Sequence, residues 1–464
     1  MLKRICLVAA LVTQLIGCAL AAPVNEDHLR AQAKDGARKP NVIIILADDL
    51  GFGDLSSYGA TLISTPNIDR LADEGVRMTS FYAGANVCSP SRASLLTGRY
   101  PIRSGMQFVI RPHSAGGLPA EEITIAELLR NAGYATGMIG KWHLGHQAEY
   151  WPTRQGFDSF YGVAYSNDMM PFDLYEGTEI VESPVDQTQL TPKYTDAAIR
   201  FIEENADQPF FLYYAENLPH IPLFYPLQNA GRSDAGEYGD VVETLDDAVG
   251  EVLNALDRLD IADDTLIIFT SDNGPWFEGS AGELRDRKGG TSQGSFQVPM
   301  LARWPGTIPA GTESSEMAMS IDILPTVAAI AGVALPDDRE IDGRNILPVL
   351  SEGAPTPHDA LYFFDGNDVV AVRDRRYRLL LQVFYRNRTL NFLDTSGYKW
   401  WAPLLFDVQK DPSESYSIAA REPEVMRTLM KRAAAMSDAT ASLHKVPDPL
   451  RAAPEIPAGP QLDQ

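Results

Sequence analysis

The segment CSPSRASLLTG places Cys88 where a helix is expected to begin. Ser89 can act as the helix N-cap, and Pro90 suits the first helical position because its missing N–H would be unpaired there in any case. Gly98 can end the helix in the left-handed conformation. The N–H groups and dipole at a helix start favour negative charge. We therefore expect Cys88 to be reactive, with Arg92 one turn away and able to reach back toward it. The alternative is an ordinary cysteine beside a capped helix.

Two pairs of oxygen-bearing side chains follow two strongly apolar segments. The run NVIIILA ends directly before Asp48 and Asp49, and the run TLIIFT is followed one residue later by Asp272 and Asn273. In open α/β sheets, ligands bind at the carboxyl ends of the strands. Oxygen ligands suit a hard cation such as Ca²⁺ or Mg²⁺. We therefore expect these residues to hold one divalent cation, although an aspartate after a strand is also a common turn cap.

Four further residues supply positive charge or exchangeable protons. Lys141 and His143 stand in the segment GKWHLG, His220 stands between prolines in LPHIP, and Lys288 stands in the loop segment DRKGGT. Each segment is weak by itself, because a Lys-x-His pair is usually solvated and a histidine between prolines is often structural. As a set they predict a local cluster of cations that can attract an anionic substrate.

Strands and helices must alternate to bring these segments together. Apolar runs typical of strands covered on both faces occupy residues 41–47, 210–215 and 265–270, and a further short strand is expected at 135–140. Helical spacing or capping signals mark residues 65–74, 124–131, 240–259 and 321–331. This alternation predicts an α/β fold with a large, mostly parallel but mixed sheet sandwiched by helices.

The pattern changes near residue 355. Short apolar segments separated by turn residues occupy 361–364, 369–373, 378–383 and 404–408, and a helical segment occupies 424–437. They predict a small α+β region with an antiparallel sheet. We expect a catalytic domain at 38–350, a C-terminal antiparallel subdomain at 355–445, and an irregular proline-rich tail at 446–464.

The first 21 residues have the pattern of a secretory signal peptide, with a basic start, an apolar stretch and small residues before Pro23. Cleavage after Ala21 would release a periplasmic or secreted protein. The segment LIGC resembles a lipoprotein processing site, and the alternative is therefore an anchor on the membrane through an acylated Cys18. Without that anchor we expect no membrane partner.

The net charge and the cysteine content exclude some classes of function. The 464 residues include 62 acidic and 39 basic ones, which gives a formal net charge of −23. This acidity argues against nucleic acid as a partner. Of the three cysteines, Cys6 and Cys18 lie in the signal segment, so the exported chain would keep only Cys88. With no internal disulfide available, Cys88 is either a tolerated free thiol or functional.

The motifs together resemble the type I sulfatases, the formylglycine-dependent, arylsulfatase A-like branch of the alkaline phosphatase superfamily. The segment CSPSR followed by LTG is similar to the maturation signature of that family. The other motifs follow in the family's order between about residue 40 and about residue 415, and the branch pattern also includes YSND, which contains Ser166. Ser91 is a common alternative inside the signature, and the disulfides of animal relatives are absent.

The resemblance implies that a maturation enzyme converts Cys88 to formylglycine, whose hydrate is the nucleophile. It implies one Ca²⁺ per chain, with Mg²⁺ less favoured, bound by Asp48, Asp49, Asp272, Asn273 and residue 88. Hydrolysis of a sulfate ester would then pass through a covalent sulfo-enzyme. Asp272 is also placed to accept the proton of the nucleophile.

The resemblance also assigns roles to the cations and histidines. Lys141, Lys288, His220 and Ser166 would contact the sulfate group, and either His220 or Lys288 would protonate the leaving oxygen. His143 would be the base that regenerates the aldehyde, and Arg92 would orient the hydrate. The expected substrate is a sulfated small molecule or glycan.

Two other functions fit parts of the pattern. A phosphonate or phosphate ester hydrolase would use the same metal and nucleophile. A non-catalytic, Ca²⁺-dependent carbohydrate-binding protein would fit the acidity and the export signal, but it would not explain why Lys141, His143, His220 and Lys288 accompany Cys88.

Overall fold

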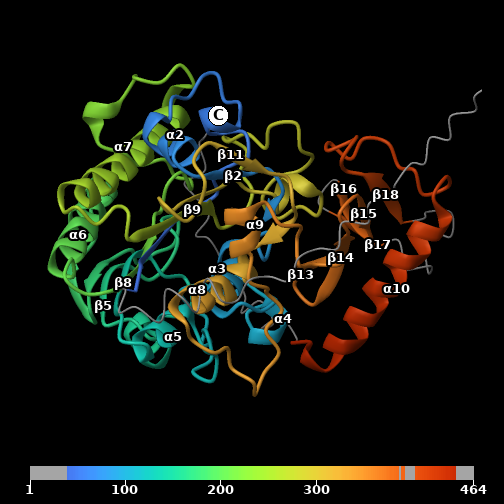
Figure 1. Cartoon of the computed structure of the whole chain (residues 1–464), viewed down its shortest axis with the longest axis horizontal. Coiled ribbons are helices and arrows are strands. Elements are labelled where there is room, and N and C mark those ends of the chain that lie inside the picture. The colour runs from blue at the N-terminus through green and yellow to red at the C-terminus, as the bar shows by residue number, and fades with distance from the viewer. Residues whose placement is uncertain (1–38, 386–387, 392–402, 446–464) are drawn as a thin grey trace, which may run out of the picture. The chain divides into compact units, whose positions relative to one another are not determined.

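The computed structural model describes residues 39–385, 388–391 and 403–445. Its central element in that part of the chain is a ten-stranded sheet with the order β11-β2-β10-β9-β1-β8-β4-β5-β6-β7 (Figure 1). The strands are β1 (Asn41–Ala47), β2 (Val76–Met78), β4 (Ala135–Lys141), β5 (Ser159–Val163), β6 (Leu174–Glu176), β7 (Glu179–Glu182), β8 (Phe210–Ala215), β9 (Thr265–Ser271), β10 (Met300–Arg303) and β11 (Thr312–Ser314).

The middle of this sheet is parallel and its flanks are mixed. Strand β1 pairs in parallel with β8 and β9, and β4 pairs in parallel with β8 and β5. Strand β10 runs antiparallel between β9 and β2, and β6 runs antiparallel to both β5 and β7. The predicted mixed, mostly parallel sheet is confirmed.

Helices cover both faces of the sheet, which is why β1 is apolar at every position but its first. Alternate residues of β1 belong to two separate cores: Ile44 packs with the α3, α5 and α8 layer, and Ile43 packs with the α2, α6 and α7 layer. The helices are α2 (Pro66–Asp73), α3 (Cys88–Thr97), α4 (Pro101–Ser104), α5 (Ile125–Asn131), α6 (Leu190–Glu204), α7 (Gly236–Arg258), α8 (Ile323–Ala331) and α9 (Leu347–Glu352).

Short 3-10 turns connect several of these elements. They are η1 (Ser56–Tyr58), η2 (Ala148–Tyr150), η3 (Pro152–Arg154), η4 (Gln187–Gln189), η5 (Leu227–Asn229), η6 (Gln293–Ser295), η7 (Ser320–Asp322) and η8 (Ala441–Leu443).

Helix α3 differs from the prediction at its first turn. The helix begins at Cys88, and the residue in the N-cap position is Val87 in extended conformation. Ser89 is therefore not the N-cap: it lies within the helix, and its hydroxyl accepts a hydrogen bond from the N–H of Ile110 at 3.0 Å. Gly98 ends the helix with a φ of 68°, as predicted. The earlier start places Cys88 in the first turn of the helix.

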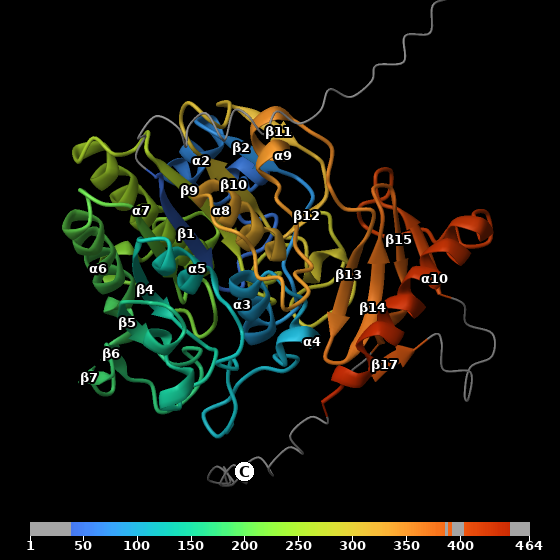
Figure 2. The ribbon, with the colours of Figure 1, turned by 60° about the horizontal axis from the view of Figure 1, so that its bottom comes forward.

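A four-stranded antiparallel sheet follows, with the order β13-β14-β15-β18, and the long helix α10 (Pro423–Thr440) packs along β14 and β15 (Figure 2). Its strands are β13 (Leu361–Asp365), β14 (Asp368–Arg373), β15 (Tyr377–Leu380) and β18 (Leu404–Asp407). The segment expected as one strand at 378–383 breaks at Leu381 and continues as β16 (Gln382–Tyr385), which pairs with β17 (Arg388–Asn391).

An aromatic core joins this sheet to the rest of the molecule. The ring of Phe363 on β13 lies 5.1 Å from the ring of Tyr82 and 5.0 Å from that of Phe296. Tyr82 belongs to β3 (Phe81–Tyr82), which pairs with β12 (Ala318–Met319). The C-terminal sheet is therefore packed directly on the part of the chain that carries the functional motifs.

Three predictions fall outside the described residues: the signal segment at 1–21, the lipoprotein alternative at Cys18, and the tail at 446–464. The expected domain boundaries stay predictions. None of the helices within the described ranges combines the length and the apolar character that a membrane span requires.

Candidate active site

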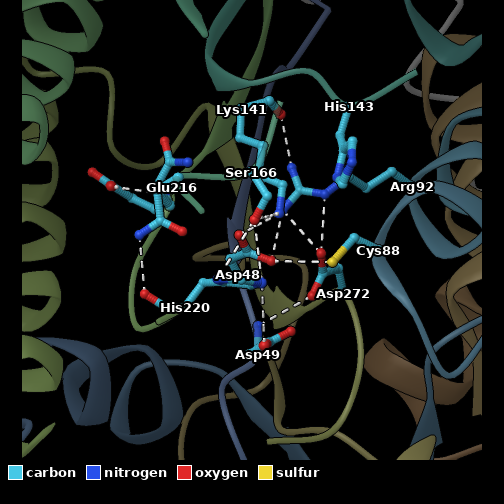
Figure 3. Close-up of polar contacts among 12 residues, drawn as sticks. Asp48, Asp49, Cys88, Arg92, Lys141, His143, Ser166, Glu216, His220 and Asp272 are labelled. Carbon is cyan, nitrogen blue, oxygen red and sulfur yellow. Dashed lines mark hydrogen bonds and ion pairs between the residues drawn. The ribbon is translucent and has the colours of Figure 1, made fainter. Parts of the chain in front are cut away.

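Three of the predicted site residues lie at the carboxyl ends of neighbouring parallel strands. Asp48 directly follows β1, Asp272 directly follows β9, and Lys141 is the last residue of β4, one strand beyond β8. Figure 3 shows Cys88 of α3 beside Asp48 and Asp272. The strands therefore bring together residues that are up to 224 positions apart in the sequence, as predicted from their strand-end positions.

Cys88 is buried at the centre of this cluster. Its Sγ lies 3.6 Å from Oδ1 of Asp48 and 3.3 Å from Nζ of Lys288. Burial alone would raise the pKa of the Cys88 thiol, but the charges of Lys141 and Lys288 lower the pKa below its usual value. Residue 88 therefore lies in surroundings that favour an anionic, nucleophilic group.

Asp48 is held between two buried cations. Lys141 Nζ lies 2.5 Å from its Oδ2, and the Arg92 guanidinium lies 3.4 Å from its Oδ1. Burial opposes the charge, but Lys141, His220 and Arg92 hold the pKa of Asp48 well below its usual range. Asp48 is therefore ionised at neutral pH.

Arg92 also fixes Asp272 and the end of β4. Its Nε donates to Oδ2 of Asp272 at 3.0 Å and its Nη1 donates to the carbonyl of Lys141 at 2.7 Å. Burial and the nearby charges of Asp48 and residue 88 raise the pKa of Asp272 well above its usual range. The pKa of Asp48 is thus lowered and that of Asp272 is raised. Of the two, Asp272 is the better acceptor of a proton from a neighbouring hydroxyl.

Asp49 receives Lys288 and Asn273. Lys288 Nζ lies 2.8 Å from Oδ1 of Asp49, and the Asn273 amide donates to the same oxygen at 2.7 Å. Asp49 has a φ of 66°, in the left-handed region that most non-glycine residues avoid. This backbone turn lets consecutive aspartates face the same site.

The donor set fits a divalent cation. One ligand atom from each of Asp48, Asp49, Cys88 and His220 lies within 4.8 Å of the others. Oδ1 of Asn273 is buried and has no hydrogen-bond partner within the described part of the chain. A hard cation would bind the carboxylates and this orphaned oxygen. The sequence analysis did not include His220 among the residues expected to bind the cation.

His220 and Ser166 line the same space from two loops. The Ser166 hydroxyl lies 3.2 Å from Nζ of Lys141 and 3.2 Å from Nε2 of His220, which itself lies 3.6 Å from Oδ2 of Asp49. Burial alone would lower the pKa of His220, but Asp48, residue 88 and Asp49 raise the pKa to about 9. His220 therefore carries a proton at neutral pH.

His143 differs from His220 in the direction of its pKa shift. Burial and the charges of Lys141 and Arg92 hold the pKa of His143 well below its usual range. Its Nε2 lies 2.9 Å from the carbonyl oxygen of Ile110, a contact in which the nitrogen must donate, so that Nδ1 is left unprotonated. Nδ1 is buried with no partner among the described residues. His143 is thus neutral, with a free basic nitrogen.

Sequence reasoning missed two supports of the site. The Asn167 side-chain amide donates to the carbonyls of His220 and Pro222, at 3.1 and 3.0 Å, and so fixes the histidine loop. Glu216, the residue after β8, is buried and bonded to hydroxyls of Tyr214 and Thr191. Asn167 stands in the quoted YSND segment, but nothing in its type predicted a contact 53 residues away.

A buried cysteine, a donor set that fits a hard cation and a cluster of cationic side chains fit a metal-assisted hydrolase of anionic esters. The Sulfatase family model matches residues 40–333, and the model described as N-sulphoglucosamine sulphohydrolase, C-terminal, matches residues 288–439. The chain belongs to the sulfatase family and is a sulfuric ester hydrolase.

Named relatives and solved structures agree with this family. The chain is 38% identical to human arylsulfatase A over 85% of this chain and 87% of that protein. It is 33% identical to human steryl-sulfatase over 89% and 90% of the two chains. The crystal structure of the PsFucS1 sulfatase from Pseudoalteromonas sp. superposes with a TM-score of 0.81 at 29% identity, covering 92% of this chain and 96% of that one. The predicted alkaline phosphatase-like fold and sulfatase activity are confirmed.

Proposed function

We propose that Cys88 is the precursor of the nucleophile and is matured to formylglycine by a separate enzyme. The observation that carries this proposal is the position of Sγ, 3.6 Å from a carboxylate oxygen of Asp48 and 3.3 Å from the ammonium of Lys288. Cys88 is also the free cysteine of the described residues. A hydrated aldehyde at this position would offer one hydroxyl to attack sulfur and a second to expel sulfate afterwards.

Asp48, Asp49, Asp272 and Asn273 would hold a single divalent cation, and the all-oxygen set from these four residues favours Ca²⁺. When bound, the ion would lower the pKa of a hydroxyl on residue 88 and polarise the sulfuryl group. Asp272, which lies beside residue 88, would accept the proton of that hydroxyl.

The protonated side chains would then stabilise the sulfuryl oxygens. Lys141, Lys288 and Ser166 converge on the space above residue 88 and Asp48, where negative charge develops as the ester bond breaks. His220 is the better proton donor to the leaving oxygen, because its pKa of about 9 is close to neutral. The pKa of Lys288 lies further away. Burial would lower it, but the charges of residue 88 and Asp49 raise it well above its usual range. His143 would take the proton of the second hydroxyl.

The proposal predicts two distinguishable variants. Cys88→Ala is expected to abolish turnover, because no nucleophile remains. Cys88→Ser is expected to retain one sulfuryl group covalently, because a serine ester has no second hydroxyl to expel it. Intact-peptide mass spectrometry of active wild-type protein should show an aldehyde or its hydrate at residue 88. An unmodified thiol together with full sulfate release would overturn the proposal.

The substrate would be a sulfate ester of a small molecule or a glycan, acted on after export to the periplasm or the exterior. The export signal and the sulfated substrates of the named relatives support this assignment. Desulfation assays over aryl sulfates and defined sulfated oligosaccharides, with aryl phosphate and phosphonate esters alongside, would test it. Faster turnover of the phosphorus esters would contradict it.

A further inference from the structure

A second positively charged hollow lies apart from the catalytic cluster. It has a volume of about 530 Å³ and is lined by residues of β2, of the segment 283–297 and of the C-terminal sheet. None of the catalytic or metal-binding candidates contributes to its lining. Three arginines line it, Arg77, Arg373 and Arg375, against one acidic residue, Glu283.

Arg373 is the unusual member of this set. Its side chain is 4% exposed, and within the described ranges no carboxylate lies within ion-pair distance of it. Its guanidinium donates to the Tyr82 hydroxyl and, at 3.3 Å, to the Ser80 hydroxyl, while its Nε is buried with no partner among the described residues. Burial and the nearby Arg378 lower the pKa of Arg373 to about 10, against the more distant charges of Asp374 and Glu414, which raise it; the guanidinium therefore stays charged at neutral pH.

Burying a guanidinium without an ion-pair partner costs free energy of folding. The neighbouring arginine on β15, Arg378, has such a partner. Arg378 is equally buried but forms an ion pair with Glu414, which is buried as well. Arg373 has no such partner among the described residues, although it lines a hollow large enough for a ligand. A carboxylate-like partner in direct contact with Arg373 is therefore expected to come from outside the chain.

The other two arginines leave the hollow a net positive surface. Arg375 is exposed and donates to the carbonyl of Thr356 at 3.0 Å, with no carboxylate partner within the described part of the chain. Arg77 is paired with Glu313, which lies outside the lining. In a chain with a formal net charge of −23, a site with three arginines and one glutamate concentrates positive potential locally.

We propose that this hollow binds a sulfate-sized oxyanion, either free in solution or carried on a polyanionic chain. Guanidinium groups pair with tetrahedral oxyanions through charge-assisted hydrogen bonds. Ser80, Thr79, Gln293 and Gln297 also line the hollow. Each glutamine amide donates one N–H to a backbone carbonyl and keeps a second N–H for a ligand. The proposal does not rest on the sulfatase mechanism, because the two sites share no lining residue.

Equilibrium dialysis with radiolabelled inorganic sulfate at low ionic strength tests the proposal on the full chain. The wild type is expected to bind two sulfates, one at the catalytic site as product and one in the hollow. Arg375→Gln should weaken the second binding step by about tenfold or more, the size expected for one charged hydrogen bond. Glu283→Gln should strengthen it.

Controls separate this site from the catalytic one. Arg130→Gln removes an exposed arginine on α5 and should leave both steps unchanged. The inhibition constant of sulfate for ester hydrolysis, which reports the catalytic site, should be the same in Arg375→Gln and wild type. Because Arg373→Gln alters a buried side chain, its binding data are interpreted only alongside its melting temperature.

A second arm identifies the source of the oxyanion. A size-defined sulfated dextran replaces inorganic sulfate, and its affinity is compared in wild type, Arg375→Gln and Arg130→Gln. If Arg375→Gln loses affinity for the dextran alone, the hollow anchors a sulfated chain. If Arg375→Gln loses affinity for inorganic sulfate, the hollow is a site for the free ion. A single sulfate per chain, with unchanged dextran affinity in Arg375→Gln, would overturn the proposal.

Discussion

Individual charges in the active site are set by their neighbours more than by their own type. Asp48 and Asp272 are both buried aspartates on adjacent strands, yet Lys141, His220 and Arg92 lower the pKa of the first, whereas burial and Asp48 raise the pKa of the second. His220 and His143 are likewise driven to opposite protonation states. Each residue can then perform a different proton transfer at one pH.

Lys288→Ala should separate catalysis from stability. Its ammonium contacts residue 88 and Asp49, so its removal takes positive charge from the place where negative charge is expected to develop. We expect kcat to fall by about 10²-fold or more, with a change in melting temperature of only a few degrees. Lys410→Ala, at an exposed position, is the matched control. Parallel losses of folding and activity would contradict this role.

Glu216→Gln should change how stability depends on pH. Burial raises the pKa of Glu216 to about 7, above its usual value of 4.5. Between these values the folded state keeps a proton that the unfolded state has lost, and stability therefore falls as pH rises from about 4.5 to about 7. Glutamine carries no titratable proton, so the variant should not show this fall in the free energy of unfolding, which is at most about 3 kcal/mol.

Melting temperatures of wild type and Glu216→Gln at pH 5 and pH 7.5 check this expectation. The variant should gain on the wild type at the higher pH and show little advantage at the lower one. Asp234→Asn, an exposed acid, serves as the control. Equal pH profiles for wild type and Glu216→Gln would contradict the assignment.

At the scale of elements, the strands that carry the site were predictable because both faces of each are buried. Strands β1, β8 and β9 are buried at every position, so their sequences are nearly continuous apolar runs. Strand β7 was missed because it lies at the edge of the sheet and is largely exposed, and its neighbour β6 was missed because it has only three residues. The N-cap of α3 was misplaced because Ser89 bonds to Ile110, a contact that no local pattern encodes.

The loop that carries Lys288 depends on the C-terminal sheet. Glu414 accepts the N–H of Gln293 at 2.7 Å, and Arg378 donates to the carbonyl of Thr291 at 2.6 Å. These two buried side chains also pair with each other. The segment just after Lys288 is thus fixed by residues more than 80 positions away, which is why the sequence could name Lys288 but not its support.

Glu414→Gln should therefore affect both stability and rate. It leaves Arg378 buried without its counter-charge, which costs about 3–5 kcal/mol, and it weakens the bond to Gln293. We expect a lower melting temperature, a reduced kcat and faster amide exchange over residues 288–293. The combined Arg378→Met and Glu414→Leu variant should recover stability without recovering kcat, because both bonds to the loop stay missing. Full recovery of kcat would contradict a positioning role.

At the scale of the whole molecule, the proposed metal donors come from distant parts of the sequence that lie on neighbouring strands of one sheet. Asp48 and Asp49 follow β1 near the start of the described chain, whereas Asp272 and Asn273 follow β9, its parallel neighbour. Motif order predicted the family and the sheet. It could not predict how the C-terminal sheet packs on the catalytic loops, because that contact depends on aromatic side chains such as Phe363 that carry no functional signal.

A cation held between β1 and β9 should stabilise the entire fold. Binding to the folded state alone adds about 2.7 kcal/mol at a concentration 100-fold above Kd, and it relieves the repulsion among buried carboxylates. We expect the melting temperature in CaCl₂ to exceed that in chelator, with a smaller effect of MgCl₂. Asp49→Asn should remove most of this difference. Asp54→Asn should retain it, because Asp54 is bonded to Gly51, Ser280 and Tyr238 and lies outside the donor set. An equal calcium-dependent shift in Asp49→Asn and wild type would place the cation elsewhere in the molecule.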